Sequence, residues 1–428
     1  MDLQIPKGTR DLEPEKAIVR KKIVDTLKRV FELYGFPPLE TPMFERYDVL
    51  ASKYAGGEEI LKETFKFSDQ GKRELGLRYD LTVPMCRFIA MNSSMKMPFK
   101  RYQVGEVFRD GPVATARYRQ FTQCDVDVVG NKSITADAEI IALTQRAFKE
   151  LGLEATVKIN NRKILNDLLT CAGVEQKMHD TAILSIDKLE KFGLDSVKKE
   201  LHEKGIDKKT IEKTSSLISV KGTNNEKLKS LQTELGMTEG LREMEETLSL
   251  LKDLKIDVVF DVSLARGLSY YTGIVMEVFL NDSSVKSAVC AGGRYDKIIG
   301  QFIGRGEYPA VGISFGLDRI YDAYVEKNKA GSKTVALVYI APIGTLKESI
   351  KIAEELRNEN VPVDIDLQKK GPSKNLAYAN SQGIPFVVFI GEEELKSGKI
   401  KLKDMKSGTE EIMDAKDLVV FLQSSLEK

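Results

Sequence analysis

Histidine is scarce in this sequence, and its scarcity excludes several kinds of catalytic site. Only His179 and His202 occur among 428 residues, both in a stretch rich in lysine and glutamate. A Ser-His-Asp triad, a Cys-His pair or a histidine-rich metal site is therefore not expected. We predict that both histidines are solvated surface residues. Any catalysis must then depend on arginines, carboxylates, tyrosines and bound metal.

Cysteine is also sparse, and no two cysteines lie close together along the chain. The four cysteines are Cys86, Cys124, Cys171 and Cys290. Because no Cys-x-x-Cys pair exists, neither a zinc ribbon nor a disulfide framework is expected. A reducing, cytoplasmic setting fits this pattern.

Long apolar runs and an excess of charge of either sign are missing as well. The longest apolar runs, such as residues 386–390, are far too short to span a bilayer, and residues 1–16 do not resemble a signal peptide. We therefore expect no membrane partner. Lysine and arginine number 65 and aspartate and glutamate 64, which gives a net charge of +1. This balance excludes a globally basic nucleic-acid binder but not a local basic patch.

Two common nucleotide-binding motifs are absent. The sequence contains no Gly-x-x-x-x-Gly-Lys-[Ser/Thr] motif, so a P-loop is excluded, and no complete Gly-x-Gly-x-x-Gly follows a predicted strand. A nucleotide would have to be bound by another fold.

The length predicts about three domains, and 42% hydrophobic with 30% charged residues is typical of a soluble globular protein. The spacing of apolar residues predicts helices over 14–34 and 134–151. Residues 75–130 are predicted to form strands and turns. From about 165 to 254 the pattern is helical and dense in lysine and glutamate.

The last part of the chain alternates between strands and helices. A helix follows Arg319 and ends at a break near 327–332. The strands predicted on either side of this helix are 258–263, 273–280, 334–340, 361–367 and 385–391. Those beyond the break alternate with helical segments, which predicts a small α/β domain.

Residues 100–130 are predicted to form two strands around a loop that contains Gly111 and Pro112. If Arg109 lies opposite Arg119, alternation places two different sets of side chains on the two faces. The polar face carries Arg101, Gln103, Arg109, Arg119, Phe121, Gln123, Asp125 and Asp127. The apolar face carries Tyr102, Val104, Phe108, Cys124, Val126 and Val128. The alternative to a binding surface is the solvent-facing side of an antiparallel sheet.

Three further segments carry candidate groups. In a predicted strand over 75–84, Arg78, Asp80 and Thr82 share one face, and a carboxylate with a hydroxyl suits an ammonium group; the alternative is an ordinary amphipathic strand. In 261–279, Arg266 precedes Gly267, and Tyr271 is predicted to face the polar side with Glu277; the alternative is a core tyrosine.

The third segment, 308–320, is predicted to run from a strand through glycines into a helix. Gly316 would let a flat ligand approach the backbone, and Arg319 could meet a phosphate. The alternative is a packing glycine and a surface arginine. Arg109, Arg266 and Arg319 together suit phosphoryl or adenylyl chemistry, in which positioning and charge neutralisation dominate.

These segments resemble the class II aminoacyl-tRNA synthetases, and specifically the histidyl-tRNA synthetase family. Residues 34–46 (YGFPPLETPMFER) resemble its motif 1, the 100–130 hairpin its motif 2 and 308–320 its motif 3. LARGLSYYTG (264–273) resembles the signature peculiar to histidyl enzymes.

The resemblance implies an α+β fold in which helices flank an antiparallel sheet. The catalytic domain would span 1–328, interrupted by a helical insertion at about 172–252, and 333–428 would be a C-terminal α/β anticodon-binding domain. It also implies a homodimer joined through motif 1. The implied reaction uses histidine and ATP with Mg²⁺ to form histidyl-adenylate, and then esterifies the 3′ end of histidine tRNA.

The family's roles can be carried over to matching positions. Arg109 would grip the α-phosphate and the substrate carboxylate, and Arg266 would hold the α-phosphate from the other side. Arg319 would contact the γ-phosphate and cover the adenine, with Phe121 on the opposite face. Arg117 would meet the pyrophosphate end or the tRNA terminus, and Gly316 belongs to the ATP site.

For histidine, Asp80, Thr82 and Gln123 would bind the α-ammonium, while Asp127 and Tyr271 would bond the two imidazole nitrogens. Leu81, Tyr270, Arg109 and Arg266 complete the histidine site. A competitor without these ring nitrogens leaves buried groups unpaired, which can be worth about 10⁴–10⁵ in discrimination.

One departure affects the adenine contact. The general class II hairpin carries Arg-x-Glu, but this chain has Arg109-Asp110-Gly111, which leaves Asp110 or a backbone carbonyl to meet the adenine amino group. The sequence assigns no metal ligands. The alternatives to an enzyme are a histidine-binding regulatory paralogue and a tRNA-sensing module, but the α/β tail and the three arginines favour the enzyme.

Overall fold

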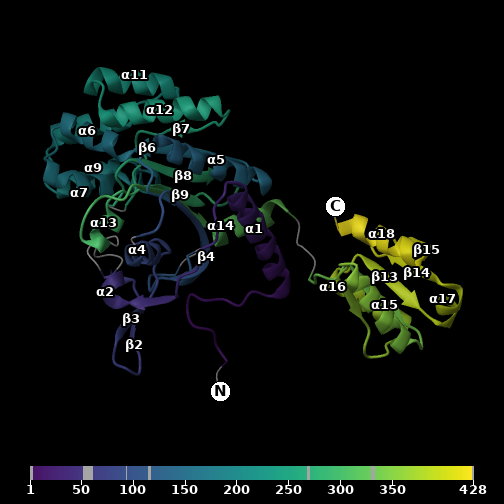
Figure 1. Cartoon of the computed structure of the whole chain (residues 1–428). Helices are drawn as coiled ribbons and strands as arrows, with labels where there is room; N and C mark the ends of the chain where they lie inside the picture. Colours follow the sequence, from purple (N-terminus) through teal and green to yellow (C-terminus); the bar gives the residue numbers. More distant parts are fainter. Residues whose placement is uncertain are drawn as a thin grey trace. The chain divides into compact units, whose positions relative to one another are not determined.

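The computed structural model describes residues 3–51, 61–92, 94–113, 117–267, 270–328 and 333–426 (Figure 1). The chain divides into two compact units, one of residues 1–10 and 23–328 and the other of 11–22 and 329–428. The length had predicted about three domains, but the helical segment packs with the larger unit. In the described part of the chain, no helix is long and apolar enough to cross a membrane.

A seven-stranded sheet forms the centre of the larger unit, with the strand order β4-β5-β10-β9-β8-β6-β7. Its neighbouring strands are antiparallel except for the parallel pair β6–β7. The strands are β4 (Phe99–Phe108), β5 (Gln120–Val129), β6 (Ala155–Asn161), β7 (Val259–Phe260), β8 (Ile274–Leu280), β9 (Cys290–Arg294) and β10 (Ala310–Gly316). The predicted antiparallel α+β architecture is confirmed.

Helices α1 (Pro14–Leu33) and α5 (Ile134–Glu150) cover one face of this sheet. The Phe31 ring of α1 lies 5.6 Å from Tyr102 and 5.4 Å from Phe315, and Phe148 of α5 stacks on Phe315 at 6.0 Å. Since these sheet residues belong to the apolar face, the opposite face is left for polar side chains.

Two short helices pack together beside the sheet, α4 (Thr82–Met91) and α13 (Ile298–Ile303). Their apolar side chains share a buried cluster that includes Met85, Ile89 and Ile299. Helix α14 (Leu317–Lys327) continues directly from β10. These helices begin next to the polar face.

A small separate sheet has the order β1-β3-β2 and is followed along the chain by α4. Its elements are β1 (Phe44–Arg46), α2 (Tyr47–Leu50), β2 (Lys66–Ser68) and β3 (Glu74–Leu77). The predicted strand over 75–84 is therefore wrong beyond Leu77. The carboxylate of Asp80 accepts hydrogen bonds from the amides of Thr82 and Val83, at 3.1 and 2.9 Å, which satisfies the free N–H groups of a first helical turn.

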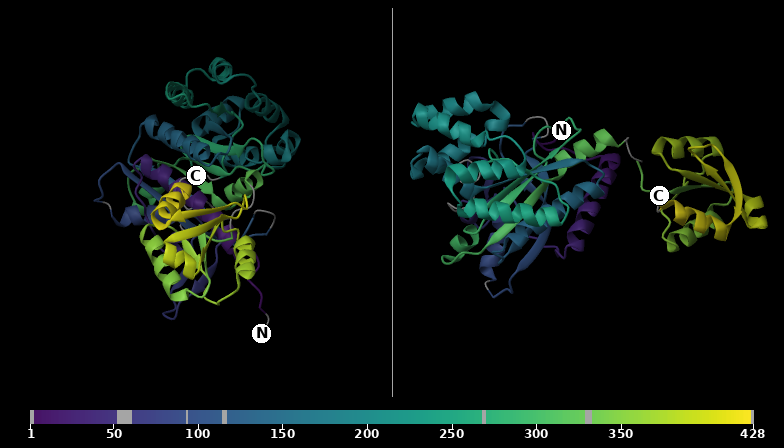
Figure 2. Two further views of the ribbon diagram at one scale, coloured as in Figure 1. Left: turned by 90° about the vertical axis from the view of Figure 1, so that its right-hand side faces the viewer. Right: turned by 90° about the horizontal axis from the view of Figure 1, so that it is seen from above.

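Between β6 and β7 the chain forms a block of helices, visible as one group in both views of Figure 2. They are α6 (Arg162–Ala172), η1 (Gln176–Met178), α7 (His179–Ile186), α8 (Leu189–Phe192), α9 (Leu194–Glu203), α10 (Lys208–Ile218), α11 (Asn224–Leu235) and α12 (Glu239–Asp253). His202 is exposed as predicted. The same prediction is wrong for His179, which is 7% exposed because it begins the buried stripe of α7, with its Nε2 3.1 Å from the carbonyl oxygen of Val174.

The C-terminal unit contains a five-stranded sheet in the order β12-β11-β13-β14-β15. Its elements are β11 (Val338–Pro342), α15 (Leu346–Asn358), β12 (Val363–Ile365), α16 (Pro372–Gln382), β13 (Phe386–Ile390), α17 (Glu392–Ser397), β14 (Lys399–Asp404), β15 (Glu410–Asp414) and α18 (Ala415–Leu426). The three parallel strands were predicted, although β11 begins four residues later than expected; the β14–β15 hairpin was not.

Gly292 on β9 offers a test of the sheet's packing. A Cβ at this position would lie 2.6 Å from the Cα of Ile313 on β10 and closer still to the carbonyl oxygen of Gly312. We expect Gly292→Ala to lower the free energy of unfolding by about 1–3 kcal/mol, because backbone cannot yield as a flexible side chain does. Chemical denaturation measures this change.

The matched control is Gly71→Ala. Gly71 is exposed, and an added Cβ would meet only the side chains of Asp69 and Arg73, at 3.3 Å or more. Equal stability of Gly292→Ala and the control would contradict the close approach of β9 and β10.

Candidate active site

The β4–β5 hairpin has the predicted register. Phe108 pairs with Gln120, and the amide of Arg109 donates to the carbonyl oxygen of Arg119 at 2.8 Å. The odd-numbered side chains of both strands therefore share one face, away from α1 and α5. This register brings Arg109, Phe121, Gln123 and Asp127 to the same face.

Two aromatic rings hold the guanidinium of Arg109. Its Cζ lies 4.1 Å from the ring centre of Tyr79 and 4.9 Å from that of Phe121, and its Nε donates to the carbonyl oxygen of Tyr79 at 3.4 Å. Cation–π contact of this kind fixes a charged group without neutralising it. The Arg109 charge therefore remains available to an anion.

Arg319, in the first turn of α14, faces other positive charges. Burial lowers its pKa, and the charges of Arg109, Arg117 and Arg266 lower this pKa further. Its Nη1 donates to the carbonyl oxygen of Ala288 at 2.7 Å. The charges of Arg109, Arg117 and Arg266, which come from distant segments, therefore lie within electrostatic reach of Arg319.

Arg266 is partly buried against a carboxylate. Its guanidinium pairs with Glu277 of β8, and its Cζ lies 5.9 Å from the ring centre of Tyr271. Its Nε is buried and has no hydrogen-bond partner among the described residues. Positions 268–269 of the LARGLSYYTG motif lie outside the described residues.

Glu63 links Arg117 to Tyr79, and no sequence pattern pointed to it. It accepts hydrogen bonds from Arg117 at 2.9 Å and from the Tyr79 hydroxyl at 3.2 Å. The Asp110 carboxylate, one candidate for the adenine contact, lies 3.2 Å from Arg119 in an ion pair. Arg117 is exposed, at the end of the hairpin loop.

The groups expected to bind an ammonium are gathered beside β5. Burial raises the pKa of Asp80, while its two amide hydrogen bonds oppose this rise. The Leu81 carbonyl oxygen lies 3.3 Å from Arg101 Nη2. Gln123 Nε2 donates to Ser314 Oγ at 2.6 Å, and Gln123 Oε1 is buried with no hydrogen-bond partner in the described part of the chain.

Asp127 lies deeper, beside Arg101 and Tyr295. Arg101 Nη2 lies 2.7 Å from Asp127 Oδ2, and the Tyr295 hydroxyl donates to Oδ1. The opposite residue on β10 is Gly312, where a Cβ would overlap the Asp127 carboxylate. Arg101 was placed on the polar face but given no role, although the predicted register sets it opposite Asp127. Tyr295 was not assigned a role, because its partner is distant in sequence.

Tyr270 and Tyr271 contact each other near Tyr295. Their ring centres are 4.7 Å apart, and Tyr270 lies 6.1 Å from Tyr295. Tyr271 is 6% exposed. Burial raises the pKa of Tyr270 well above its ordinary value, and the charges of Tyr271 and Asp80 raise it further.

Gly316 ends β10 opposite Gln123 of β5. Its amide donates to the carbonyl oxygen of Val289 at 2.8 Å, so its backbone is fixed at the start of α14. The described residues contain no group of three histidine, cysteine or acidic side chains that could hold a metal ion.

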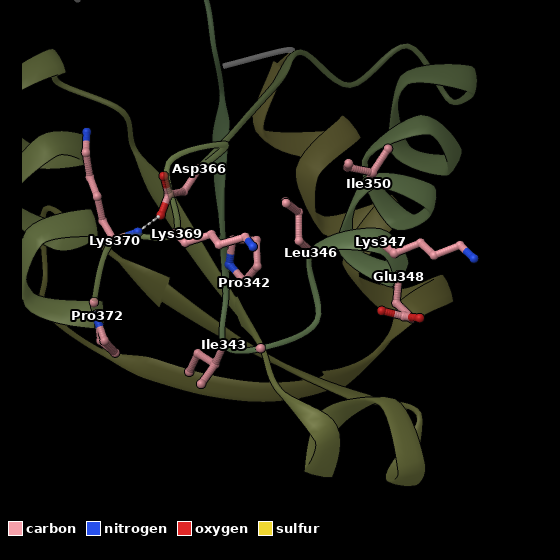
Figure 3. A pocket seen from close by; sticks show the side chains of 12 residues that line it. Pro342, Ile343, Leu346, Lys347, Glu348, Ile350, Asp366, Lys369, Lys370 and Pro372 are labelled. Carbon is pink, nitrogen blue, oxygen red and sulfur yellow. Dashed lines mark hydrogen bonds between the residues drawn. The ribbon is translucent and has the colours of Figure 1, made fainter.

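The C-terminal unit has a hollow of its own, of about 610 Å³, at the carboxyl ends of β11 and β12 (Figure 3). Lys347, Lys369 and Lys370 are among its lining residues. Asp366 accepts hydrogen bonds from the amides of Gln368 and Lys370, at 2.8 and 2.6 Å. Ligands commonly bind at this end of parallel strands.

Known proteins match both units. The family model of histidyl-tRNA synthetase matches residues 8–320, and that of the anticodon binding domain matches 337–425. The chain is 42% identical over 416 residues to histidine–tRNA ligase 1 of Bacillus cereus, which covers 96% of this chain and 97% of the relative.

It is also 43% identical over 417 residues to histidine–tRNA ligase 2 of Shouchella clausii, covering 96% of this chain and 98% of the relative. The crystal structure of histidyl-tRNA synthetase from Nostoc sp. is similar with a TM-score of 0.89 and 31% identity, covering 99% of this chain and all of that one. From these matches along nearly its whole length, this chain belongs to the histidyl-tRNA synthetase family.

Proposed function

We propose that this chain activates histidine with ATP, forming histidyl-adenylate and pyrophosphate, and transfers the histidyl group to the 3′ end of histidine tRNA. The observation that carries the proposal is that Arg109, held between the Tyr79 and Phe121 rings, lies with Arg117 and Arg266 within electrostatic reach of Arg319. Like charges held together in a protein need an anion, and a triphosphate beside a substrate carboxylate supplies one.

On the ATP side, Arg109 and Arg266 would hold the α-phosphate from two directions. The histidine carboxylate attacks this phosphorus, the bond to the bridging oxygen breaks, and pyrophosphate leaves. Negative charge grows on the α-phosphate oxygens during the attack, so fixed guanidinium groups stabilise the transition state more than the ground state.

The remaining ATP contacts follow from position. Arg319 would contact the γ-phosphate and cover the adenine, with Phe121 on the other face, and Gly316 would let the flat base approach the backbone. Arg117 would meet the pyrophosphate end or the tRNA terminus. Because Asp110 is paired with Arg119, we assign the adenine amino group to a backbone carbonyl.

On the histidine side, Asp80, Thr82 and Gln123 would surround the α-ammonium, with Leu81 and Tyr270 lining the same space. Asp127 and Tyr271 would bond the two ring nitrogens. These partners are buried, so an amino acid without ring nitrogens would leave them unpaired. That cost accounts for selectivity.

Mg²⁺ fits this site as a companion of the triphosphate. Mg²⁺ in such sites is bound largely through substrate phosphates and water, which agrees with the lack of a three-donor cluster among the described side chains. When bound, it would neutralise charge on the leaving pyrophosphate.

We assign residues 1–328 to the catalytic domain and 333–428 to the anticodon-binding domain. The lysines around the hollow at β11 and β12 suit a nucleotide of the anticodon loop. The helices at about 172–252 would contact the tRNA acceptor arm.

A cytoplasmic location agrees with free cysteines and with the absence of a membrane-spanning helix from the described part of the chain.

A homodimer would be formed through the small β1-β3-β2 sheet. Four large apolar side chains of this region are exposed, Met43, Phe44, Phe67 and Met91, at 50, 54, 40 and 73%. The Phe44 and Phe67 rings contact each other at 6.5 Å. Contiguous exposed apolar side chains are typical of a protein interface.

Arg266→Ala tests the adenylation site. We expect histidine-dependent exchange of pyrophosphate into ATP to fall by about 100- to 1,000-fold, because one transition-state charge contact is lost. Affinity for histidine tRNA should be retained, as a synthetase and a tRNA-sensing module would both predict. Only the synthetase requires the loss of exchange.

Arg242→Ala is the matched control, since Arg242 is exposed on α12. It should exchange pyrophosphate at the wild-type rate. A wild-type protein that is folded and supplied with Mg²⁺ but exchanges no pyrophosphate would reject the enzyme in favour of a regulatory paralogue.

Phe44→Asp tests the dimer. A charge placed in an apolar interface weakens the free energy of association by roughly several kcal/mol, because the charge must be desolvated. Sedimentation velocity should show the wild type as a dimer and the variant as a monomer. Phe192→Asp, at an exposed phenylalanine of the helical block, should leave the dimer intact. A monomeric wild type would refute the interface.

A further inference from the structure

A buried carboxylate without an assigned role lies at the centre of the proposed histidine pocket. Asp125 follows Gln123 and precedes Asp127 on the same face of β5, and it is 3% exposed. Its direct neighbours across the sheet are Gln103 on β4 and Ser314 on β10. Asp125 therefore lies between the groups for the ammonium and those for the imidazole.

One oxygen of this carboxylate has nothing to bond. The Ser314 side chain hydrogen-bonds Asp125, and Arg101 Nη2 lies 3.9 Å from Asp125 Oδ2. Oδ1 is buried and has no hydrogen-bond partner among the residues that the structure describes. An unpaired buried carboxylate oxygen is costly, so it favours a ligand that brings a proton or positive charge.

Without such a ligand, three buried carboxyls face one fully buried arginine. Asp80, Asp125 and Asp127 are all buried, and burial raises the pKa of each. The charge of Arg101, which is 0% exposed, opposes this rise for all three carboxyls. The charge of Asp127 raises the pKa of Asp125 further.

The other ionisable groups around the cluster do not correct the imbalance. Arg78 is near Asp125, but Glu106 lies beside it and offsets its charge. Arg109 acts on Asp80 and is assigned to the substrate carboxylate and phosphate. The remaining facing groups are neutral because burial raises their pKa well above the ordinary value. They are Cys86 on α4, Cys290 on β9, and Tyr270 and Tyr295.

We propose that Asp125 is a specificity-determining residue that makes the pocket bind histidine with its ring as imidazolium. The proposal rests on the histidine site proposed above. Three carboxylates would then face three positive charges: Arg101, the α-ammonium and the imidazolium. The added ring proton comes from the carboxyl cluster or from water, and both ring N–H groups become donors. Asp127 accepts from one of them, and Asp125 supplies the balancing negative charge.

Nitrogen-15 NMR of bound histidine tests this directly. The two ring nitrogens have similar chemical shifts in imidazolium and widely separated shifts in neutral imidazole. At pH 8 the ring of free histidine is neutral, since its ordinary pKa is about 6.5. We expect ¹⁵N-histidine bound to the full wild-type chain at pH 8 to give the similar pair. Widely separated shifts would overturn the proposal.

Two variants test whether Asp125 determines the protonation state of the bound histidine ring. Asp125→Asn should give bound histidine with separated shifts and about tenfold weaker binding at pH 8, since one pKa unit of lost stabilisation corresponds to a factor of ten. Glu243→Gln removes a carboxylate that pairs with Lys163 on the helical block, and it should keep the similar pair.

Each remaining outcome has one meaning. Imidazolium in both the wild type and Asp125→Asn would overturn the role of Asp125. If Asp125→Asn does not fold, the wild-type spectrum still decides the protonation state. A folded wild type that binds no histidine would contradict the proposed function rather than this inference.

Discussion

The pairing of β5 with β4 on one side and β10 on the other determines where each polar group of the site lies. This register puts Arg109, Phe121, Gln123 and Asp127 on one face, and it sets Gly312 opposite Asp127. Because side chains alternate along a strand, a slip by one residue would turn this whole set toward α1 and α5. The packing of Phe31, Phe148 and Phe315 on the apolar face makes such a slip costly.

The second requirement is that like charges stay together before any ligand arrives. Each arginine of the site has its own anchor. Arg109 lies between two rings, Arg266 pairs with Glu277, and Arg319 donates to a backbone carbonyl. Arg117 is anchored by Glu63. The repulsion between these arginines is therefore overcome when the chain folds. A triphosphate then binds guanidinium groups that are already oriented.

The sequence predicted those site residues that lie on strands in which polar and apolar residues alternate. The hairpin register and its two faces could be predicted because polar and apolar residues alternate clearly over both strands. The end of β3 at Leu77 could not be predicted, because polar and apolar residues continue to alternate beyond it. This alternation conceals the helix that Asp80 caps. β14 was not predicted either, although Ile400 and Leu402 alternate with lysines.

Other site residues depend on contacts that the sequence does not reveal. Glu63 and Tyr295 act on partners that are 54 and 168 residues away. His179 resembles a surface residue in composition, but its helix turns it inward. Tertiary contacts of this kind determine the partners of each site residue, whereas the local sequence pattern determines which strand face it lies on.

A crystal structure with histidine and a non-hydrolysable ATP analogue would test the central claim most directly. The account predicts the α-phosphate between Arg109 and Arg266, the γ-phosphate at Arg319, and the imidazole against Asp127. A triphosphate bound elsewhere, with these guanidinium groups still in their present contacts, would contradict it.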